Sequence, residues 1–210
     1  MKTYGRIKKR PTFNPAEKGR MNEMTHTEDS SHHTSGAVLE YVWIILGALA
    51  LTFVLRTFVF NVFTVPTGSM LNTIQEGDLL VGEKVTLLWD QPKRGDVVTF
   101  RSPADEETLL VKRVIATAGQ TVDLRDGAVY VDGEKLDEPY TEGKPSMSLA
   151  SQPGAKITDY PYTVPDGCIF VMGDNRTNSL DSRFFGPVPL KNVTTKTLFI
   201  FWPINHARGL

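Results

Sequence analysis

The chain has 210 residues, enough for one sizeable globular domain and an additional segment. Its 23 basic and 24 acidic side chains give a formal net charge of -1, so we expect no nucleic-acid partner. The single cysteine, Cys168, excludes an internal disulfide and a multi-cysteine metal site. No His-Glu-x-x-His or comparable ligand spacing occurs, so the sequence predicts neither a metal ion nor another cofactor.

Residues 1–37 predict a disordered tail, because they are largely polar and carry too little apolar surface to offset the entropy of ordering. Seven of these residues are basic and four are acidic, whereas no Lys or Arg lies between Arg56 and Lys84. Positive charge collects on the cytoplasmic side of membrane proteins. The asymmetry therefore predicts a cytoplasmic tail and a C-terminal domain outside the membrane.

An apolar segment follows the tail, and residues 38–63 predict a single transmembrane helix. No charged side chain occurs from Tyr41 to Leu55, and the apolar character continues to residue 63, about 23 residues in all. At about 1.5 Å rise per residue, this length crosses the roughly 30 Å hydrocarbon layer. The helix is expected to end before Pro66, since the residue before a proline avoids the α conformation. A cleaved secretory signal is the alternative interpretation, but its apolar run is usually shorter.

Residues 64–210 predict a mainly β, extracytoplasmic domain. The expected strands are residues 79–81, 96–100, 108–111, 114–116, 168–172 and 197–202, separated by turns rich in Gly and Asp. The last strand is nearly all apolar, as expected for one packed on both faces or lying against lipid. Residues 120–166 predict a hairpin, turning at Asp126-Gly127, and then a long excursion from the sheet.

Ser69 and Lys112 are the candidates for catalysis. A serine hydroxyl needs a base to take its proton. Three of the four histidines precede the apolar segment and the fourth, His206, is close to the end of the chain, which leaves lysine as the expected base. Apolar neighbours of Lys112 would lower its pKa, as a lysine base requires. Taken alone, however, a serine after glycine is typical of a turn, and a lysine on a strand is typically a solvated surface charge.

A dense polar run, Gly173-Asp174-Asn175-Arg176-Thr177-Asn178-Ser179-Leu180-Asp181-Ser182-Arg183, follows the expected strand at residues 168–172. Three further motifs precede it in the chain: Pro66-Thr67-Gly68-Ser69-Met70, Arg94-Gly95-Asp96-Val97-Val98 and Lys112-Arg113-Val114-Ile115-Ala116. With its N-terminal anchor and these motifs in this order, the chain resembles the bacterial type I signal peptidases over roughly residues 38–204.

The resemblance implies a signal-peptidase-like, β-rich catalytic domain with one N-terminal transmembrane helix. It implies a membrane-bound serine endopeptidase that removes N-terminal signal peptides from exported preproteins, with Ser69 as nucleophile and Lys112 as general base. The Thr67 hydroxyl and the Ser69 backbone N–H would form the oxyanion hole.

The same resemblance gives supporting roles to the polar run. Ser179 would hold the lysine amine by a hydrogen bond, and Asp181 and Arg183 would form an ion pair beside the site. The implied partners are signal peptides, the lipid bilayer and the secretion translocon. The implied location is the cytoplasmic membrane, crossed once, with the catalytic domain outside.

Two other functions compete with this interpretation. A non-catalytic, membrane-anchored β domain that binds exported segments would be expected to lack the serine or the lysine, and both are present. A self-cleaving Ser-Lys repressor protease shares the chemistry, but it would lack the anchor and carry a DNA-binding module.

Overall fold

The computed structural model describes residues 32–210, with side chains from Val38 onward. The predicted tail therefore lies outside the described residues as far as residue 31. The chain divides into two compact units, residues 1–51 and 52–210. The helix that begins at His32 starts inside the predicted tail.

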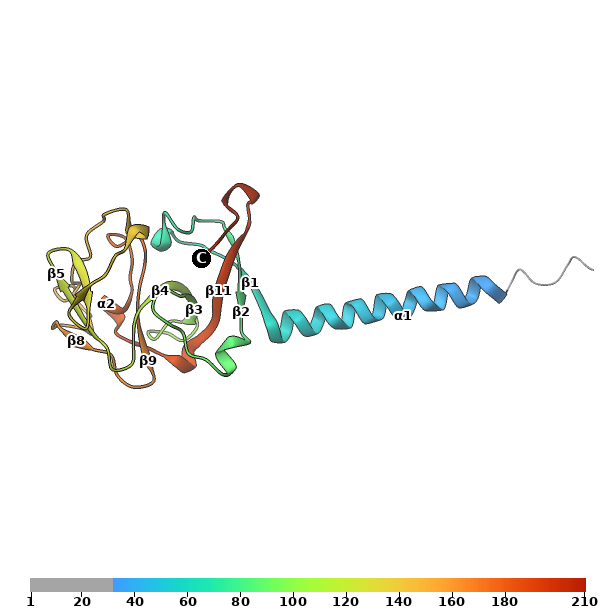
Figure 1. Ribbon diagram of the computed structural model, residues 1–210, viewed down its shortest axis with the longest axis horizontal. Coiled ribbons are helices and arrows are strands. Elements are labelled where there is room, and N and C mark those ends of the chain that lie inside the picture. The colour runs from blue at the N-terminus through green and yellow to red at the C-terminus, as the bar shows by residue number, and fades with distance from the viewer. Residues whose placement is uncertain (1–31) are drawn as a thin grey trace, which may run out of the picture. The chain divides into compact units, whose positions relative to one another are not determined.

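The N-terminal helix α1 (His32–Val54), blue to cyan in Figure 1, continues into a π-helical turn, Leu55–Val59. Within residues 32–210, Val38–Val59 is the one helical segment long and apolar enough to cross a membrane, with a mean hydropathy of 2.2 in an 18-residue window. No part of that segment is buried inside the protein. A helix that is apolar on every side and uncovered requires an apolar surrounding.

The predicted C-terminal end of this helix, residue 63, is wrong. Helical structure ends at Val59, and Phe60–Thr64 form β1, which pairs antiparallel with β2 (Leu79–Glu83). Hydropathy alone does not separate the two conformations. Four of these five residues are aromatic or β-branched, and exposed and half-buried positions alternate along the segment, which suits a pleated, half-covered surface. The edge of β2 supplies backbone partners.

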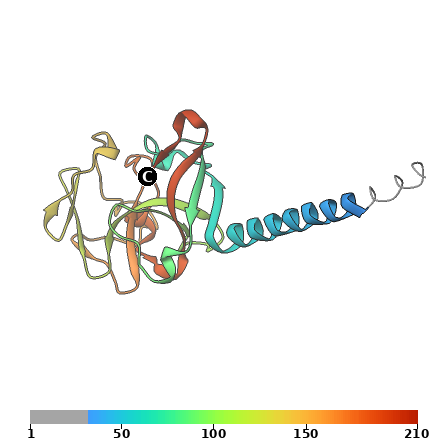
Figure 2. The ribbon, with the colours of Figure 1, turned by 45° about the vertical axis from the view of Figure 1, so that its right-hand side comes forward.

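The larger sheet has eight strands in the order β1-β2-β11-β3-β4-β9-β10, with β12 paired to β11. Figures 1 and 2 show β1, β2 and β11 side by side. The bounds of its other strands are β3 Val97–Arg101, β4 Leu109–Thr117, β9 Cys168–Met172, β10 Val188–Pro189, β11 Val193–Trp202 and β12 Arg208–Gly209. The predicted mainly β domain is confirmed, although the two short strands expected at 108–111 and 114–116 are one continuous strand, β4.

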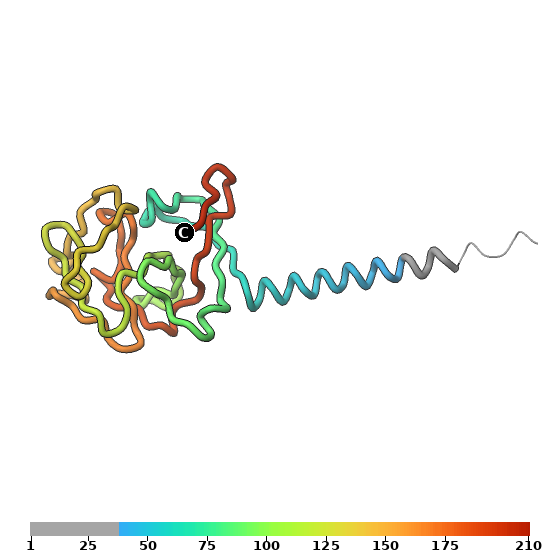
Figure 3. Tube along the Cα trace, in the orientation of Figure 1, coloured from blue at the N-terminus to red at the C-terminus, as the bar shows by residue number. Residues whose placement is uncertain are grey.

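The smaller sheet has the order β7-β6-β5-β8. Its strands are β5 Thr121–Arg125, β6 Ala128–Val131, β7 Glu134–Lys135 and β8 Tyr162–Thr163. The predicted hairpin is β5–β6, and both turn residues have positive φ, 52° at Asp126 and 74° at Gly127, as a two-residue hairpin turn favours. The tube in Figure 3 follows the predicted excursion from this hairpin to β8 and back into β9.

Short helices join these strands: η3 Gly68–Met70, η4 Thr86–Leu88, η5 Pro139–Thr141, α2 Ser182–Phe185, η6 Leu190–Asn192 and η7 Ile204–His206. Apolar cores lie on either side of the central strands β4 and β9. One cluster joins Ile115 and Met172 to the smaller sheet, and another joins Val98 and Val171 to Phe185. The two central strands are therefore held from both faces.

A third apolar cluster lies under η3, where Met70 packs with Val65, Ile74 and Leu80. Met70 is fully buried, so the turn that carries the preceding residue is fastened to the core. The last long strand, β11, is not packed on both faces at its end, because Phe201 and Trp202 are 58% and 50% exposed. Its contact with lipid, the second expectation, stays a prediction.

Candidate active site

The structure brings Ser69 and Lys112 together. Ser69 lies in η3, and Lys112 lies in the middle of β4, opposite Val98 of β3. A hydrogen bond of 2.5 Å joins Lys112 Nζ and Ser69 Oγ. Two segments separated by 43 residues in the chain thus place a hydroxyl beside an amine. When the amine is neutral, its lone pair accepts the hydroxyl proton, which is the contact a nucleophilic serine requires.

The surroundings of Lys112 favour its neutral form. Only 2% of the residue is exposed, and burial lowers the pKa of its amine from 10.5 to about 8. The carboxylates of Asp181 and Asp174 act in the opposite direction and raise this pKa, while Arg183 lowers it. Burial is the largest of these effects. The neutral amine, a minor species at pH 7, is therefore far more populated than in an ordinary lysine, as the sequence predicted from its apolar neighbours.

Thr67 is also close to the nucleophile. Its Oγ1 lies 3.4 Å from Ser69 Oγ, and the residue itself is exposed. Thr67 has an extended backbone just before η3, the turn that carries Ser69. The structure thus gathers Thr67, Ser69 and Lys112, three residues that the sequence analysis singled out.

Ser179 does not make the expected hydrogen bond to the lysine amine in this structure. Its Oγ is buried and has no hydrogen-bond partner. The hydroxyl packs instead against the Gly173 backbone, where an added Cβ would lie 2.3 Å from Ser179 Oγ and 2.4 Å from Ser69 O. Glycine at 173 is thus required by close contact between the polar run and the turn that carries Ser69.

The expected ion pair between Asp181 and Arg183 is present. Arg183 Nε and Nη2 each donate to the carboxylate at 2.8 Å, and both side chains are almost fully buried. The second oxygen of Asp181 also accepts from the Gly173 N–H at 3.0 Å. The pair therefore fixes the backbone at the start of the polar run, since bidentate contacts of this kind define geometry as well as energy.

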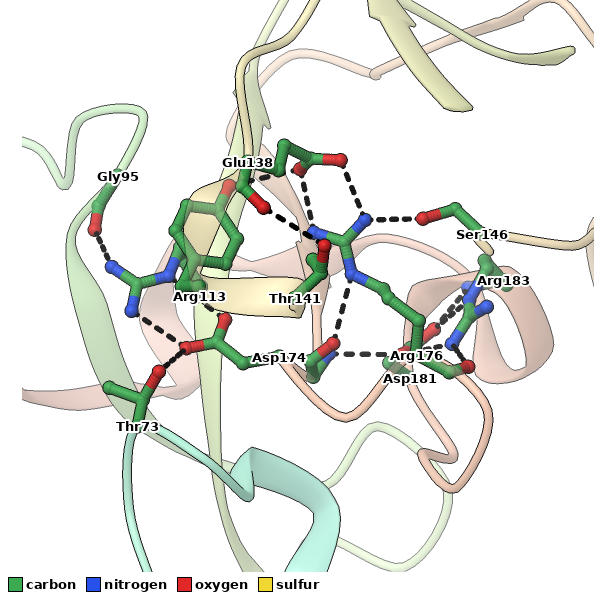
Figure 4. Close-up of polar contacts among 12 residues, drawn as sticks. Thr73, Gly95, Arg113, Glu138, Thr141, Ser146, Asp174, Arg176, Asp181 and Arg183 are labelled. Carbon is green, nitrogen blue, oxygen red and sulfur yellow. Dashed lines mark hydrogen bonds and ion pairs between the residues drawn. The ribbon is translucent and has the colours of Figure 1, made fainter. Parts of the chain in front are cut away.

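A second buried ion pair, between Arg113 and Asp174, was not expected from the sequence. Arg113 Nε and Nη2 donate to the two carboxylate oxygens at 2.9 and 2.7 Å, and its Nη1 donates to Gly95 O at 2.8 Å. Thr73 Oγ1 donates to the same carboxylate at 2.5 Å (Figure 4). The pair thus ties β4 and the polar run to the segment that follows the nucleophile. The polar motifs in the sequence indicated that charged residues gather here, but they did not indicate which of these residues form ion pairs.

Arg176 makes a third buried contact, and it fastens the excursion. Its guanidinium donates to both carboxylate oxygens of Glu138, at 2.8 and 2.6 Å, and to Ser146 Oγ at 2.5 Å (Figure 4). Glu138 and Ser146 belong to the predicted excursion, so the loop that carries Arg176 is held from outside the larger sheet. No sequence signal paired these residues.

An apolar cavity of about 220 Å³ opens beside the nucleophile. Its apolar lining includes Phe63, Val65 and Pro66 and, from β4, Leu110 and Val111, and both Ser69 and Lys112 also line it. A small apolar group placed there would lie next to the serine hydroxyl. Within residues 32–210, no group of three or more His, Cys, Asp or Glu side chains is placed to hold a metal ion.

A serine hydroxyl bonded to a buried, partly neutral lysine at the end of an apolar cavity defines a class, the serine hydrolases that use lysine as base. The comparisons with known proteins identify a peptidase family. Residues 38–202 match the family described as "Signal peptidase, peptidase S26".

Curated relatives cover most of the chain. The "Probable signal peptidase I-1" of Synechocystis is 39% identical over 80% of this chain and 85% of its own length. The "Signal peptidase I" of Bacillus licheniformis is 36% identical over 87% of this chain and 98% of its own length. A crystal structure of a signal peptidase I from Enterococcus faecalis, 34% identical, covers 51% of this chain and 97% of that one, with a TM-score of 0.42. The chain belongs to the signal peptidase, peptidase S26 family, and its activity is that of a signal peptidase.

Proposed function

We propose that this signal peptidase cleaves its substrates with Ser69 as nucleophile and Lys112 as general base. The observation that supports this assignment is the 2.5 Å contact between Ser69 Oγ and an amine whose pKa is about 8. The neutral amine takes the hydroxyl proton as Oγ attacks the scissile carbonyl, and then gives it to the departing amine. An acyl-enzyme remains on Ser69, and a water molecule deprotonated by Lys112 hydrolyses it.

The negative charge that develops on the scissile carbonyl oxygen is assigned to two donors, the Thr67 hydroxyl and the Ser69 backbone N–H. The position of Thr67 Oγ1, 3.4 Å from Ser69 Oγ, supports this assignment. A single donor of this kind typically contributes about 3 kcal/mol of transition-state stabilisation.

Ser179 is assigned to the lysine amine. A buried hydroxyl without a partner is costly, and its unpartnered Oγ supports a role in which it accepts from the ammonium that forms during catalysis. The buried pair of Asp181 and Arg183 supports the same site from behind, by fixing the backbone of the polar run.

The substrates are exported preproteins with signal peptides, and the cavity beside Ser69 is proposed to receive the side chains that precede the cut. An extended substrate strand would lie between Phe63–Pro66 and Leu109–Val111, two extended segments that line this cavity. The mostly apolar walls of this cavity favour apolar side chains.

The apolar helix and the family indicate a membrane-anchored enzyme. The cytoplasmic membrane, the tail inside, the catalytic domain outside and the contacts with lipid and the secretion translocon are proposals. The excess of basic residues before Val38 supports the orientation. Ser69 follows Val59 by ten positions, at most about 35 Å of extended chain, so the nucleophile cannot act far from the membrane.

Cleavage of a purified preprotein in detergent tests the catalytic assignment. We expect the full-length protein to release the mature product, and Ser69→Ala to release none while remaining folded by circular dichroism. Ser151→Ala, which alters an exposed serine of the excursion, should cleave at the wild-type rate. Cleavage by Ser69→Ala above background would show that another residue is the nucleophile.

A further inference from the structure

Asn175 holds both carbonyls on either side of the nucleophile's Cα. Its side-chain Nδ2 donates to Gly68 O at 2.9 Å, and its backbone N–H donates to Ser69 O at 3.1 Å. Only 5% of Asn175 is exposed, so water does not compete freely for these contacts.

The contact with Gly68 O determines where the Ser69 N–H points. The two groups belong to one planar, trans peptide, in which the C=O and the N–H point in opposite directions. A hydrogen bond that fixes Gly68 O therefore fixes the Ser69 N–H on the other side of the peptide. Gly68 is closely packed in this turn, where an added Cβ would lie 2.7 Å from Leu71 Cδ1.

Lys144 determines which way the Asn175 amide faces. Lys144 Nζ donates to Asn175 Oδ1 at 3.0 Å. A cation can only donate, so it selects the amide oxygen and leaves the amide N–H facing Gly68 O. The positive charge, the side-chain amide and the Gly68–Ser69 peptide then form one chain of hydrogen bonds with aligned dipoles. Such chains polarise their members, so the Ser69 N–H becomes a better donor.

We propose that Asn175, oriented by Lys144, is a positioning residue that aims and polarises the Ser69 N–H of the oxyanion hole. This inference rests on the proposed function, since it requires that the Ser69 N–H stabilise the oxyanion. Lys144 belongs to the excursion that follows the β5–β6 hairpin. Through Lys144, this excursion therefore affects the rate of the reaction at Ser69.

Steady-state cleavage of a preprotein by full-length Asn175→Ala, Lys144→Met and Lys144→Arg tests the proposal. We expect Asn175→Ala to lower kcat by about 10²-fold, the lower end for loss of one oxyanion donor, with KM little changed. Lys144→Met should lower kcat by roughly tenfold or less, and Lys144→Arg should restore it, because arginine still donates to Oδ1. The control Lys135→Met alters an exposed lysine of β7 and should leave kcat unchanged.

A peptide aldehyde based on the preprotein's cleavage site separates positioning from a general structural effect. Ser69 Oγ adds to the aldehyde carbon while Lys112 takes the hydroxyl proton, so the carbon becomes tetrahedral and its oxygen becomes an oxyanion. The affinity for the aldehyde therefore reports on the oxyanion hole. Affinity for the aldehyde should fall by the same factor as kcat/KM, while the pH at which activity is half-maximal should not move, since Lys112 is untouched.

The outcomes separate this inference from the proposed function. If Ser69→Ala is inactive and the folded Asn175→Ala variant keeps its kcat and its affinity for the aldehyde, the positioning role is refuted and the serine–lysine assignment stands. If the Asn175→Ala variant unfolds, Lys144→Met decides, and an unchanged kcat there refutes the relay. If Ser69→Ala cleaves, the proposed function itself fails.

Discussion

Replacing Lys112 with methionine is expected to abolish cleavage and to stabilise the folded protein near neutral pH. The amine is buried in the folded state, where its pKa is about 8, against 10.5 as an ordinary lysine. Because the unfolded chain binds the proton more tightly, the charge disfavours folding at every pH below about 8. At about 1.36 kcal/mol per pH unit, this cost is about 3 kcal/mol at pH 7.

Methionine has a similar length and no charge, so the substitution removes this cost. It also removes the hydrogen bond to Ser69, which offsets about 1 kcal/mol. The net gain of about 2 kcal/mol corresponds to a rise in Tm of about 4 to 8 °C for a domain of this size. The gain in stability depends on pH. As the pH rises from about 8 towards 10.5, the lysine of the unfolded chain also loses its proton, so the cost of the buried charge disappears.

Thermal unfolding in detergent at pH 7 and pH 10 measures both effects. Lys112→Met should have a higher Tm than the wild type at pH 7 and little or no advantage at pH 10. Lys135→Met, at an exposed lysine of β7, should shift Tm by much less and equally at both pH values. A lower Tm for Lys112→Met at pH 7, or a gain of equal size at pH 10, would refute the account of a buried amine with a lowered pKa.

Three further outcomes are expected. The cleavage rate should increase with pH through about 8, because the neutral amine is the base. Lys112→Arg should be inactive at every pH in the same assay. A cleavage rate that falls as the pH rises through about 8 would contradict the assignment of Lys112 as the base. Met70→Ala should lower the free energy of unfolding by about 2 to 5 kcal/mol in denaturant titrations, since Met70 is fully buried under the nucleophile's turn; a loss below about 1 kcal/mol would show that the turn does not depend on this anchor. Asp174→Ala should destabilise by about 3 to 5 kcal/mol, because it leaves the Arg113 charge buried without its partner. The surface variant Asp90→Ala, which removes an exposed ion pair, should cost much less.

The sequence predicted features that depend on neighbouring residues. The strand at 168–172 and the hairpin turn at Asp126-Gly127 are encoded by local patterns, and both are present. The helix end was missed because hydropathy does not distinguish a helix from an apolar edge strand at Phe60–Thr64. The segment forms a strand because it pairs with β2.

Within the site too, features set by neighbouring residues could be predicted from the sequence, and contacts between distant residues could not. The roles of Ser69 and Lys112 could be predicted from motifs, and the apolar neighbours of Lys112 indicated its lowered pKa. The contacts of Asp174 with Arg113 and Thr73 could not, because they join residues 61 and 101 positions apart and depend on how three strands dock. A single motif identifies which residues are charged, but the order of the strands in the sheet determines which charged residues form ion pairs.

The loop that begins at Gly173 imposes an order of events during synthesis. Asn175 and Asp174 hold the turn around Ser69, yet the ribosome makes them about a hundred residues after it. A growing chain therefore exposes its serine long before the groups that hold the turn exist, and contacts so distant in sequence form late in folding. The nascent enzyme is consequently inert until its polar loop has docked, and nascent chains that stop before residue 173 should not cleave a preprotein.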